Sequence, residues 1–160
     1  MSSMHSGPTL AQRAGLTVID CRECGWAHLW PFPDVAPDFY EKAFWATKGA
    51  GWLERYEAER DWLDMRHGDW LSVVHEHDDV ITWLDVGCGY GFLLDVVKAA
   101  GDVGYGCDLS AEAVAYAQKV HGGCVWQCDY HTADERYDCI SALWLMEHLP
   151  KPFDFLSWAR

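Results

Sequence analysis

The sequence is poor in basic residues: 12 Lys and Arg stand against 25 Asp and Glu, and the net charge is −13. Binding to a nucleic-acid backbone requires clustered Lys and Arg, so this balance argues against nucleic acid as a partner. The chain also lacks a long apolar run and a cationic amphipathic helix, so we expect no membrane anchor. No internal repeat or low-complexity tract is present.

The composition is otherwise that of a folded protein, with 50% hydrophobic and 23% charged residues. A chain of 160 residues has room for one domain and a small N-terminal appendage. Seven cysteines are an odd number, and the first residues lack the apolar core of a secretion signal. We therefore expect reduced thiols and a cytoplasmic location.

The most informative stretch is WLDVGCGYGFLL, residues 83–94. It predicts a buried strand that ends in an acid and turns through three alternating glycines into a helix. A turn without side chains there indicates a ligand that lies against the backbone. The spacing D-x-G-x-G-x-G, followed by bulky residues, differs from the G-x-G-x-x-G of dinucleotide-binding folds.

Strands are expected over residues 80–86, 103–107, 124–128 and 137–143, separated by helices over 92–100 and 110–121 and followed by one from 152. This alternation predicts an α/β fold, a doubly wound, mostly parallel Rossmann-like sheet with about four strands. Upstream we expect a mobile leader over 1–17 and helices over 38–48 and 52–75. The expected domains are a leader with a CxxC turn (1–37), a Trp-rich helical lid (38–78) and the Rossmann-like domain (79–160).

Three acids follow successive predicted strands: Asp85, Asp108 and Asp129. The carboxyl ends of parallel strands line the crevice in which open α/β sheets bind ligands. Asp108 is placed to accept hydrogen bonds from a ribose diol, and Asp129 with Tyr130 to frame an adenine. Asp85 could fix the loop or attract a cationic group. Each acid alone could equally serve a turn or a helix cap.

The motif D-x-G-x-G-x-G resembles motif I of class I S-adenosylmethionine (SAM)-dependent methyltransferases. Residues 137–152, YDCISALWLMEHLPKP, look like that family's fourth-strand region, and CRECG with a later Glu54-Arg55-Tyr56 is similar to one of its branches. The resemblance implies methyl transfer from SAM to a small molecule, such as a sugar or polyketide-like intermediate. It implies cofactor contacts from Asp85, Gly87, Cys88, Gly89, Gly91, Asp108, Leu109, Asp129, Tyr130 and Leu143, with S-adenosylhomocysteine (SAH) as product.

The family's sheet normally has seven strands, so a chain ending at Arg160 would leave its fourth strand at an edge. Such an edge invites pairing, and we expect a truncated chain, a homo-oligomer or a partner chain that covers it. One alternative function is a non-catalytic SAM- or SAH-binding module. A nicotinamide-dependent oxidoreductase is less favoured, because bulky residues follow the glycine loop.

Two further groups could carry chemistry. Glu147 and His148 follow the fourth strand, where a general base could act on a hydroxyl acceptor, although a merely structural role is favoured. Cys21, Cys24 and His28 could ligate zinc, with His5 as a distant fourth candidate. A remnant turn with free thiols is the favoured interpretation of that segment, because no second C-x-x-C follows.

Overall fold

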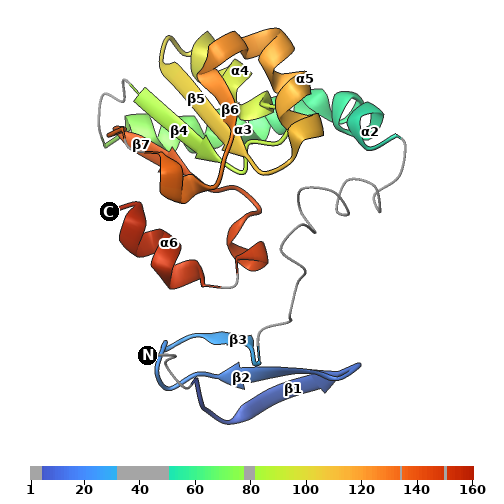
Figure 1. Ribbon diagram of the computed structural model, residues 1–160, viewed down its shortest axis with the longest axis vertical. Coiled ribbons are helices and arrows are strands. Elements are labelled where there is room, and N and C mark those ends of the chain that lie inside the picture. Colours follow the sequence, from blue (N-terminus) through green and yellow to red (C-terminus); the bar gives the residue numbers. More distant parts are fainter. Residues whose placement is uncertain (1–4, 32–50, 78–81, 134, 150) are drawn as a thin grey trace. The chain divides into compact units, whose positions relative to one another are not determined.

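Figure 1 shows the computed structural model of the chain, which describes residues 5–31, 51–77, 82–133, 135–149 and 151–160. The chain forms two compact units, Met1–Ala36 and Pro37–Arg160. The second unit therefore includes the segment that we expected to be a separate helical lid. The helix predicted over 38–48 lies outside the described residues.

The first unit is a small antiparallel sheet with strand order β1-β2-β3. Its strands are β1 (Thr9–Arg13), β2 (Leu16–Asp20) and β3 (Ala27–Leu29). Ala14 and Gly15, with φ angles of 52° and 81°, form the tight turn between β1 and β2. The prediction of a mobile leader over 1–17 is therefore wrong for this segment, because pairing with β2 orders β1.

The second unit contains a parallel sheet of order β6-β5-β4-β7, which confirms the predicted fold class. Its strands are β4 (Thr82–Val86), β5 (Val103–Asp108), β6 (Val125–Gln127) and β7 (Cys139–Ser141). The crossover helices are α4 (Phe92–Ala99) and α5 (Ala111–His121). Ser110 is the N-cap of α5, since its Oγ accepts a hydrogen bond from the Ala113 amide at 3.2 Å.

Two helices precede the sheet, α2 (Trp52–Ala58) and α3 (Arg60–His75), where the periodicity predicted one continuous helix. Glu59 interrupts the helix, because its ψ of 8° departs from the helical value. Three short 3₁₀ turns are present among the described residues: η2 (Gly122–Cys124) follows α5, η3 (Tyr130–Thr132) follows β6, and η4 (Met146–His148) follows β7. The last element is α6 (Pro152–Trp158).

Side chains alternate across the sheet and so define its two layers. Trp83 packs with Leu71 of α3 and Val97 of α4 on one face. Leu84 is fully buried on the opposite face, in a cluster that includes Phe155 of α6. Figure 1 shows α6 on the side of the sheet away from α4 and α5. The apolar alternation thus places helices on both faces and leaves the carboxyl ends of the strands open to a ligand.

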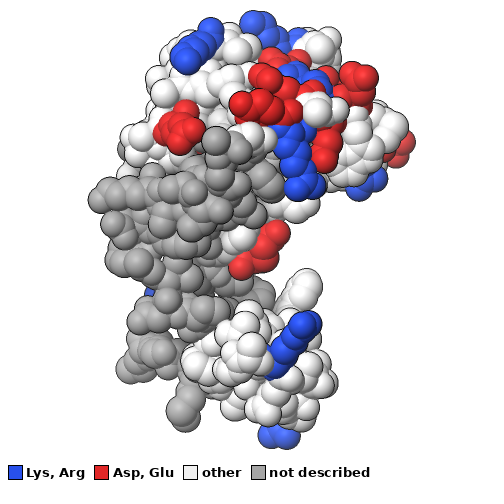
Figure 2. Space-filling model, turned by 90° about the vertical axis from the view of Figure 1, so that its right-hand side faces the viewer, with Lys and Arg blue, Asp and Glu red and all other residues white. Residues whose placement is uncertain are grey.

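The surface of the second unit carries acids mixed with basic residues, as Figure 2 shows for one face. Arg55 pairs with Glu59 at 3.1 Å, and Arg60 bridges Asp64 and Asp95. Within the described part of the chain, no helix is long and apolar enough to cross a membrane.

Gly106, in the middle of β5, provides a test of the packing beneath the sheet. A Cβ there would lie 2.8 Å from Cys88 Sγ and 3.0 Å from Leu94 Cδ1. We predict that Gly106→Ala lowers the free energy of unfolding by about 1–3 kcal/mol, measured by urea denaturation, because both neighbours must shift. Gly123→Ala is the control, because a Cβ on Gly123 would meet nothing within 4 Å. Equal stability of the two variants would contradict this packing.

Candidate functional site

A pocket of about 350 Å³ opens at the carboxyl ends of β4, β5 and β6. This volume lies within the range of small-molecule sites. Its walls come from the glycine loop after β4, the ends of the next two strands, helices α2 and α3, the start of α4, and the segment that follows β7. The lining residues are Tyr56, Leu63, His67, Asp85, Val86, Gly87, Cys88, Gly89, Tyr90, Phe92, Leu93, Cys107, Asp108, Leu109, Cys128, Asp129, Tyr130, Leu143, Trp144, Leu145, His148 and Leu149.

The glycine loop is held against the end of β5. The amides of Gly87 and Cys88 both donate to the Cys107 carbonyl, at 2.8 and 3.1 Å. Gly87 and Gly89 have φ angles of 74° and 52°, a region that favours glycine. The loop backbone therefore forms a floor of the pocket without a Cβ at either glycine.

Gly91, the third glycine of the motif, lies at the start of α4 and not among the residues that line the pocket. It is the N-cap of α4 with φ 81°, and a Cβ on it would lie 3.0 Å from the His121 ring. It does not line the pocket, although we expected it to approach the cofactor. The positive φ and the close packing against α5 both favour a glycine at this position.

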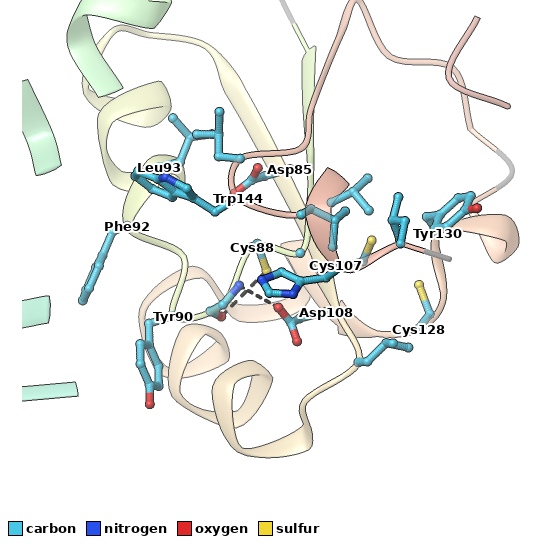
Figure 3. Close-up of a pocket in the computed structure, with 18 of the residues that line it drawn as sticks. Asp85, Cys88, Tyr90, Phe92, Leu93, Cys107, Asp108, Cys128, Tyr130 and Trp144 are labelled. Atoms are coloured by element: carbon cyan, nitrogen blue, oxygen red, sulfur yellow. Dashed lines mark hydrogen bonds between the residues drawn. The ribbon is translucent and has the colours of Figure 1, made fainter. Parts of the chain in front are cut away.

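Asp108 connects three elements at the centre of the site (Figure 3). Its Oδ2 accepts a hydrogen bond from the Gly89 amide at 2.9 Å, and its Oδ1 accepts one from the Ser110 amide at 2.8 Å. Burial raises the pKa of Asp108, while these backbone donors counteract the shift. A carboxylate has about four acceptor positions, more than the backbone donors fill, so Asp108 can still accept a hydrogen bond from a ligand.

Asp85 is the most deeply buried acid of the site, with 4% of its surface exposed. Its Oδ1 accepts a hydrogen bond from Ser141 Oγ of β7 at 2.7 Å. Burial raises the pKa of Asp85 to about 7; the Ser141 hydrogen bond lowers it and the charge of Asp108 raises it further. The carboxyl group therefore titrates near neutral pH, and a nearby cation would favour its ionised form.

Asp129 and Tyr130 lie at the end of β6. Asp129 Oδ1 accepts a hydrogen bond from the His131 amide at 3.1 Å and so caps η3. The Tyr130 ring contacts Phe155 and Trp158, each with a centroid distance of 5.0 Å. The structural role that we considered for Asp129 is thus present, and the side chain also borders the pocket.

Two buried thiols near the glycine loop have little nucleophilic character. Burial is the main cause that raises the pKa of Cys88 and of Cys107 well above the ordinary value, and nearby acids add to it. Because the thiolate is the reactive form, these groups act as neutral packing elements of the wall.

The pocket wall contains two residues that the sequence pattern did not single out, His67 of α3 and Trp144 of the turn after β7. His67 is 4% exposed, and burial lowers its pKa to about 4. Its Nδ1 has no hydrogen-bond partner among the described residues. Trp144 has a φ of 53°, which is strained for a bulky residue, and its ring centroid lies 5.7 Å from that of Trp70.

The structure brings nearly all of the predicted cofactor contacts to this one pocket. Of the predicted cofactor contacts, Gly91 is the exception. Of the two candidate bases, His148 lines the pocket and Glu147 does not. The predicted metal ligands belong to the first unit and are treated separately below.

The parallel sheet and the pocket at its carboxyl end define a Rossmann-like ligand-binding domain. The fold is similar to that of the plantazolicin methyltransferase BpumL in complex with SAH, with a TM-score of 0.53 and 18% identity. This match covers 75% of the present chain and 49% of BpumL.

Residues 54–160 match a family described as "Methyltransferase domain", and the chain therefore belongs to this family. It is 31% identical over 87 residues to a ubiquinone biosynthesis O-methyltransferase of Hydrogenovibrio crunogenus, which is 49% of this chain and 36% of the relative. It is 37% identical over 69 residues to juvenile hormone acid O-methyltransferase of Bombyx mori, or 36% of this chain and 25% of the relative. The matched region thus spans about a third or less of each curated relative.

From the raised pKa of Asp85 we can predict how the free energy of unfolding depends on pH. Between pH 4 and 7 the folded state keeps the Asp85 proton while the unfolded state loses it, so this residue's contribution to stability falls as the pH rises. We predict that Asp85→Asn becomes more stable relative to wild type over this range, by up to about 4 kcal/mol, with a plateau above pH 7. Urea denaturation at each pH measures the difference, and a difference independent of pH would refute the assignment.

Proposed function

We propose that this chain is a class I methyltransferase that binds SAM in the pocket and transfers its methyl group to a small molecule. The observation that supports this most is the pair of hydrogen bonds that joins Asp108 to the Gly89 and Ser110 amides. They place Asp108, which can accept further hydrogen bonds, directly beside the glycine loop, whose backbone carries no Cβ at Gly87 and Gly89. A ligand with a diol and a flat base fits these two features together.

In this proposal Asp108 accepts hydrogen bonds from the ribose hydroxyls, and Gly87 and Gly89 let the methionine part approach the backbone. Asp129 and Tyr130 frame the adenine, with Cys88 and Leu109 beside the nucleoside and Leu143 near the sulfonium. Support comes from the common location of these residues around one pocket. The carboxylate of Asp85 is the group that would attract the cationic end of the ligand.

The bound SAM supplies an activated methyl group on its sulfonium, so the residues of the chain mainly position the acceptor. Apolar and aromatic side chains line the helical side of the pocket, among them Tyr56, Leu63 and Phe92. They favour an acceptor with an apolar or aromatic body, and hence the polyketide-like over the sugar-like alternative. The names of both curated relatives, which are O-methyltransferases, favour an oxygen acceptor.

A hydroxyl acceptor loses a proton during transfer, and two histidines border the pocket. We propose His148 of η4 as the general base, because it lines the pocket and belongs to the same segment after β7 as Leu143. The neutral ring of His67, whose buried Nδ1 is unpartnered among the described residues, is suited to orient the acceptor. We do not propose Glu147, the other candidate base, since it does not border the pocket.

We also propose a cytoplasmic setting, because all seven cysteines are free thiols in the structure. β7 is an edge strand of the described sheet. We expect this edge to be covered, either by further strands or by a second chain, since open edges invite pairing.

The ribose assignment is tested by calorimetric titration with SAH. We predict that Asp108→Ala weakens binding at least about tenfold, because two hydrogen bonds to a charged acceptor are lost. Asp69→Ala, an exposed acid on α3, is the control and is expected to bind as wild type does.

Because Asp108 also holds the loop, a ligand-side measurement complements the variant. The wild-type chain should bind adenosine more tightly than 2′,3′-dideoxyadenosine by a similar factor. Equal affinity for the two nucleosides would overturn the ribose assignment.

Catalysis is tested by following the conversion of SAM to SAH with a panel of small aromatic and aliphatic hydroxyl compounds. We predict turnover that His148→Gln lowers by about 10²-fold or more in kcat, while SAH affinity is unchanged. His77→Gln, an exposed residue after α3, is the control. Tight SAH binding without turnover on any compound would favour the non-catalytic module, and binding of NAD but not SAH would favour the oxidoreductase.

A further inference from the structure

Four potential metal ligands converge in the first unit. One ligand atom from each of His5, Cys21, Cys24 and His28 lies within 4.8 Å of all the others. His5 Nδ1 is 3.1 Å from Cys24 Sγ and 3.5 Å from Cys21 Sγ. Ligands around tetrahedral zinc stand roughly 3.3–3.8 Å apart, as follows from metal–ligand bonds of about 2.0–2.3 Å. The cluster is thus close to the size of a tetrahedral site.

The chain builds half of this cluster with a tight turn after β2. The Gly25 amide donates to the Cys21 carbonyl at 2.8 Å, and the Cys21 amide donates to the Trp26 carbonyl at 3.0 Å. Gly25 has a φ of 72°, so the turn requires a left-handed residue just after Cys24. This turn directs both thiols of the C-x-x-C motif toward one point.

The two histidines come from segments that flank the turn. His28 lies on β3, where it pairs with Ile19 of β2. His5 is brought near by the chain before β1, since the Arg22 amide donates to the Ser6 carbonyl at 2.9 Å. The backbones are close here: a Cβ on Gly7 would lie 1.8 Å from the Asp20 carbonyl oxygen.

We propose that these four residues bind one structural Zn²⁺ ion in a Cys₂His₂ site. His28 Nδ1 lies 2.8 Å from the Leu29 carbonyl oxygen, so a proton on Nδ1 leaves Nε2 for the metal. A backbone carbonyl that orients a histidine in this way is typical of zinc ligands. Four protein ligands close the coordination sphere, which indicates a structural and not a catalytic ion.

The first unit is small, and a bound zinc ion would stabilise its fold. Among its described residues, only Ile19 and Cys21 are buried. A unit of fewer than about 40 residues rarely folds on apolar burial alone, and metals or disulfides usually supply the missing stability. Its cysteines are free thiols and form no disulfide, so a bound metal ion is the cross-link that these residues can provide.

The first measurement is the zinc content of the full chain, purified under reducing conditions and dialysed against metal-free buffer. We expect about one zinc ion per chain. Replacement by Co²⁺ should give the strong visible absorption of a tetrahedral site and a sulfur-to-metal charge-transfer band. A chain with no zinc that also shows neither signal on Co²⁺ titration would overturn the proposal.

Variants assign the ligands. Cys24→Ser and His5→Ala should each lower the affinity for zinc by at least about 10-fold, measured by competition with a chromophoric chelator. Cys124→Ser and His77→Ala are the controls, because both residues lie in the second unit, and they should keep zinc as wild type does. Loss of zinc in the controls alone, or unchanged zinc affinity in both ligand variants, would refute the assignment.

Zinc removal separates this proposal from the proposed methyl transfer. We expect chelation to remove the hydrogen-exchange protection of the β1–β3 amides, while the amides of β4 and β5 stay protected. SAH binding belongs to the second unit, so its presence or absence leaves the zinc result unaffected. Unchanged protection of β1–β3 in a zinc-free chain would overturn the structural role.

Discussion

The hydrogen bonds of the Asp108 carboxylate are the interaction on which the site depends. One oxygen holds the glycine loop after β4 through Gly89, and the other holds the start of α5 through Ser110. The parallel pairing of β4 with β5 brings these three segments together at one end of the sheet. A single half-buried side chain thereby sets the distance between the glycine loop and the carboxylate oxygens beside it.

This arrangement places two acidic side chains close together away from solvent, which is energetically unfavourable. Asp85 and Asp108 lie on neighbouring strands, and the charge of Asp108 makes ionisation of Asp85 less favourable. Ser141 and the backbone amides compensate part of that cost. A site that holds acids in this state favours a ligand that brings positive charge, which agrees with the proposed sulfonium compound.

The two units of the chain differ in what stabilises their folded structures. The second has apolar clusters on both faces of a parallel sheet, with side chains such as Leu84 and Val97 fully buried. The first has almost no apolar interior among its described residues, and in the zinc proposal its geometry comes from coordination chemistry. Burial of apolar surface thus stabilises the second unit, and in the zinc proposal metal coordination stabilises the first.

Local sequence patterns were sufficient to predict the α/β class, the strand that leads into the glycine loop, and the acids at the strand ends. These features are local, because alternation and glycine spacing act over a few residues. Three contacts follow from the three-dimensional packing instead: Gly91 packs against α5, His67 lines the pocket, and His5 lies beside Cys21. No local pattern encodes such contacts, since each depends on how segments far apart in the chain pack or pair in space.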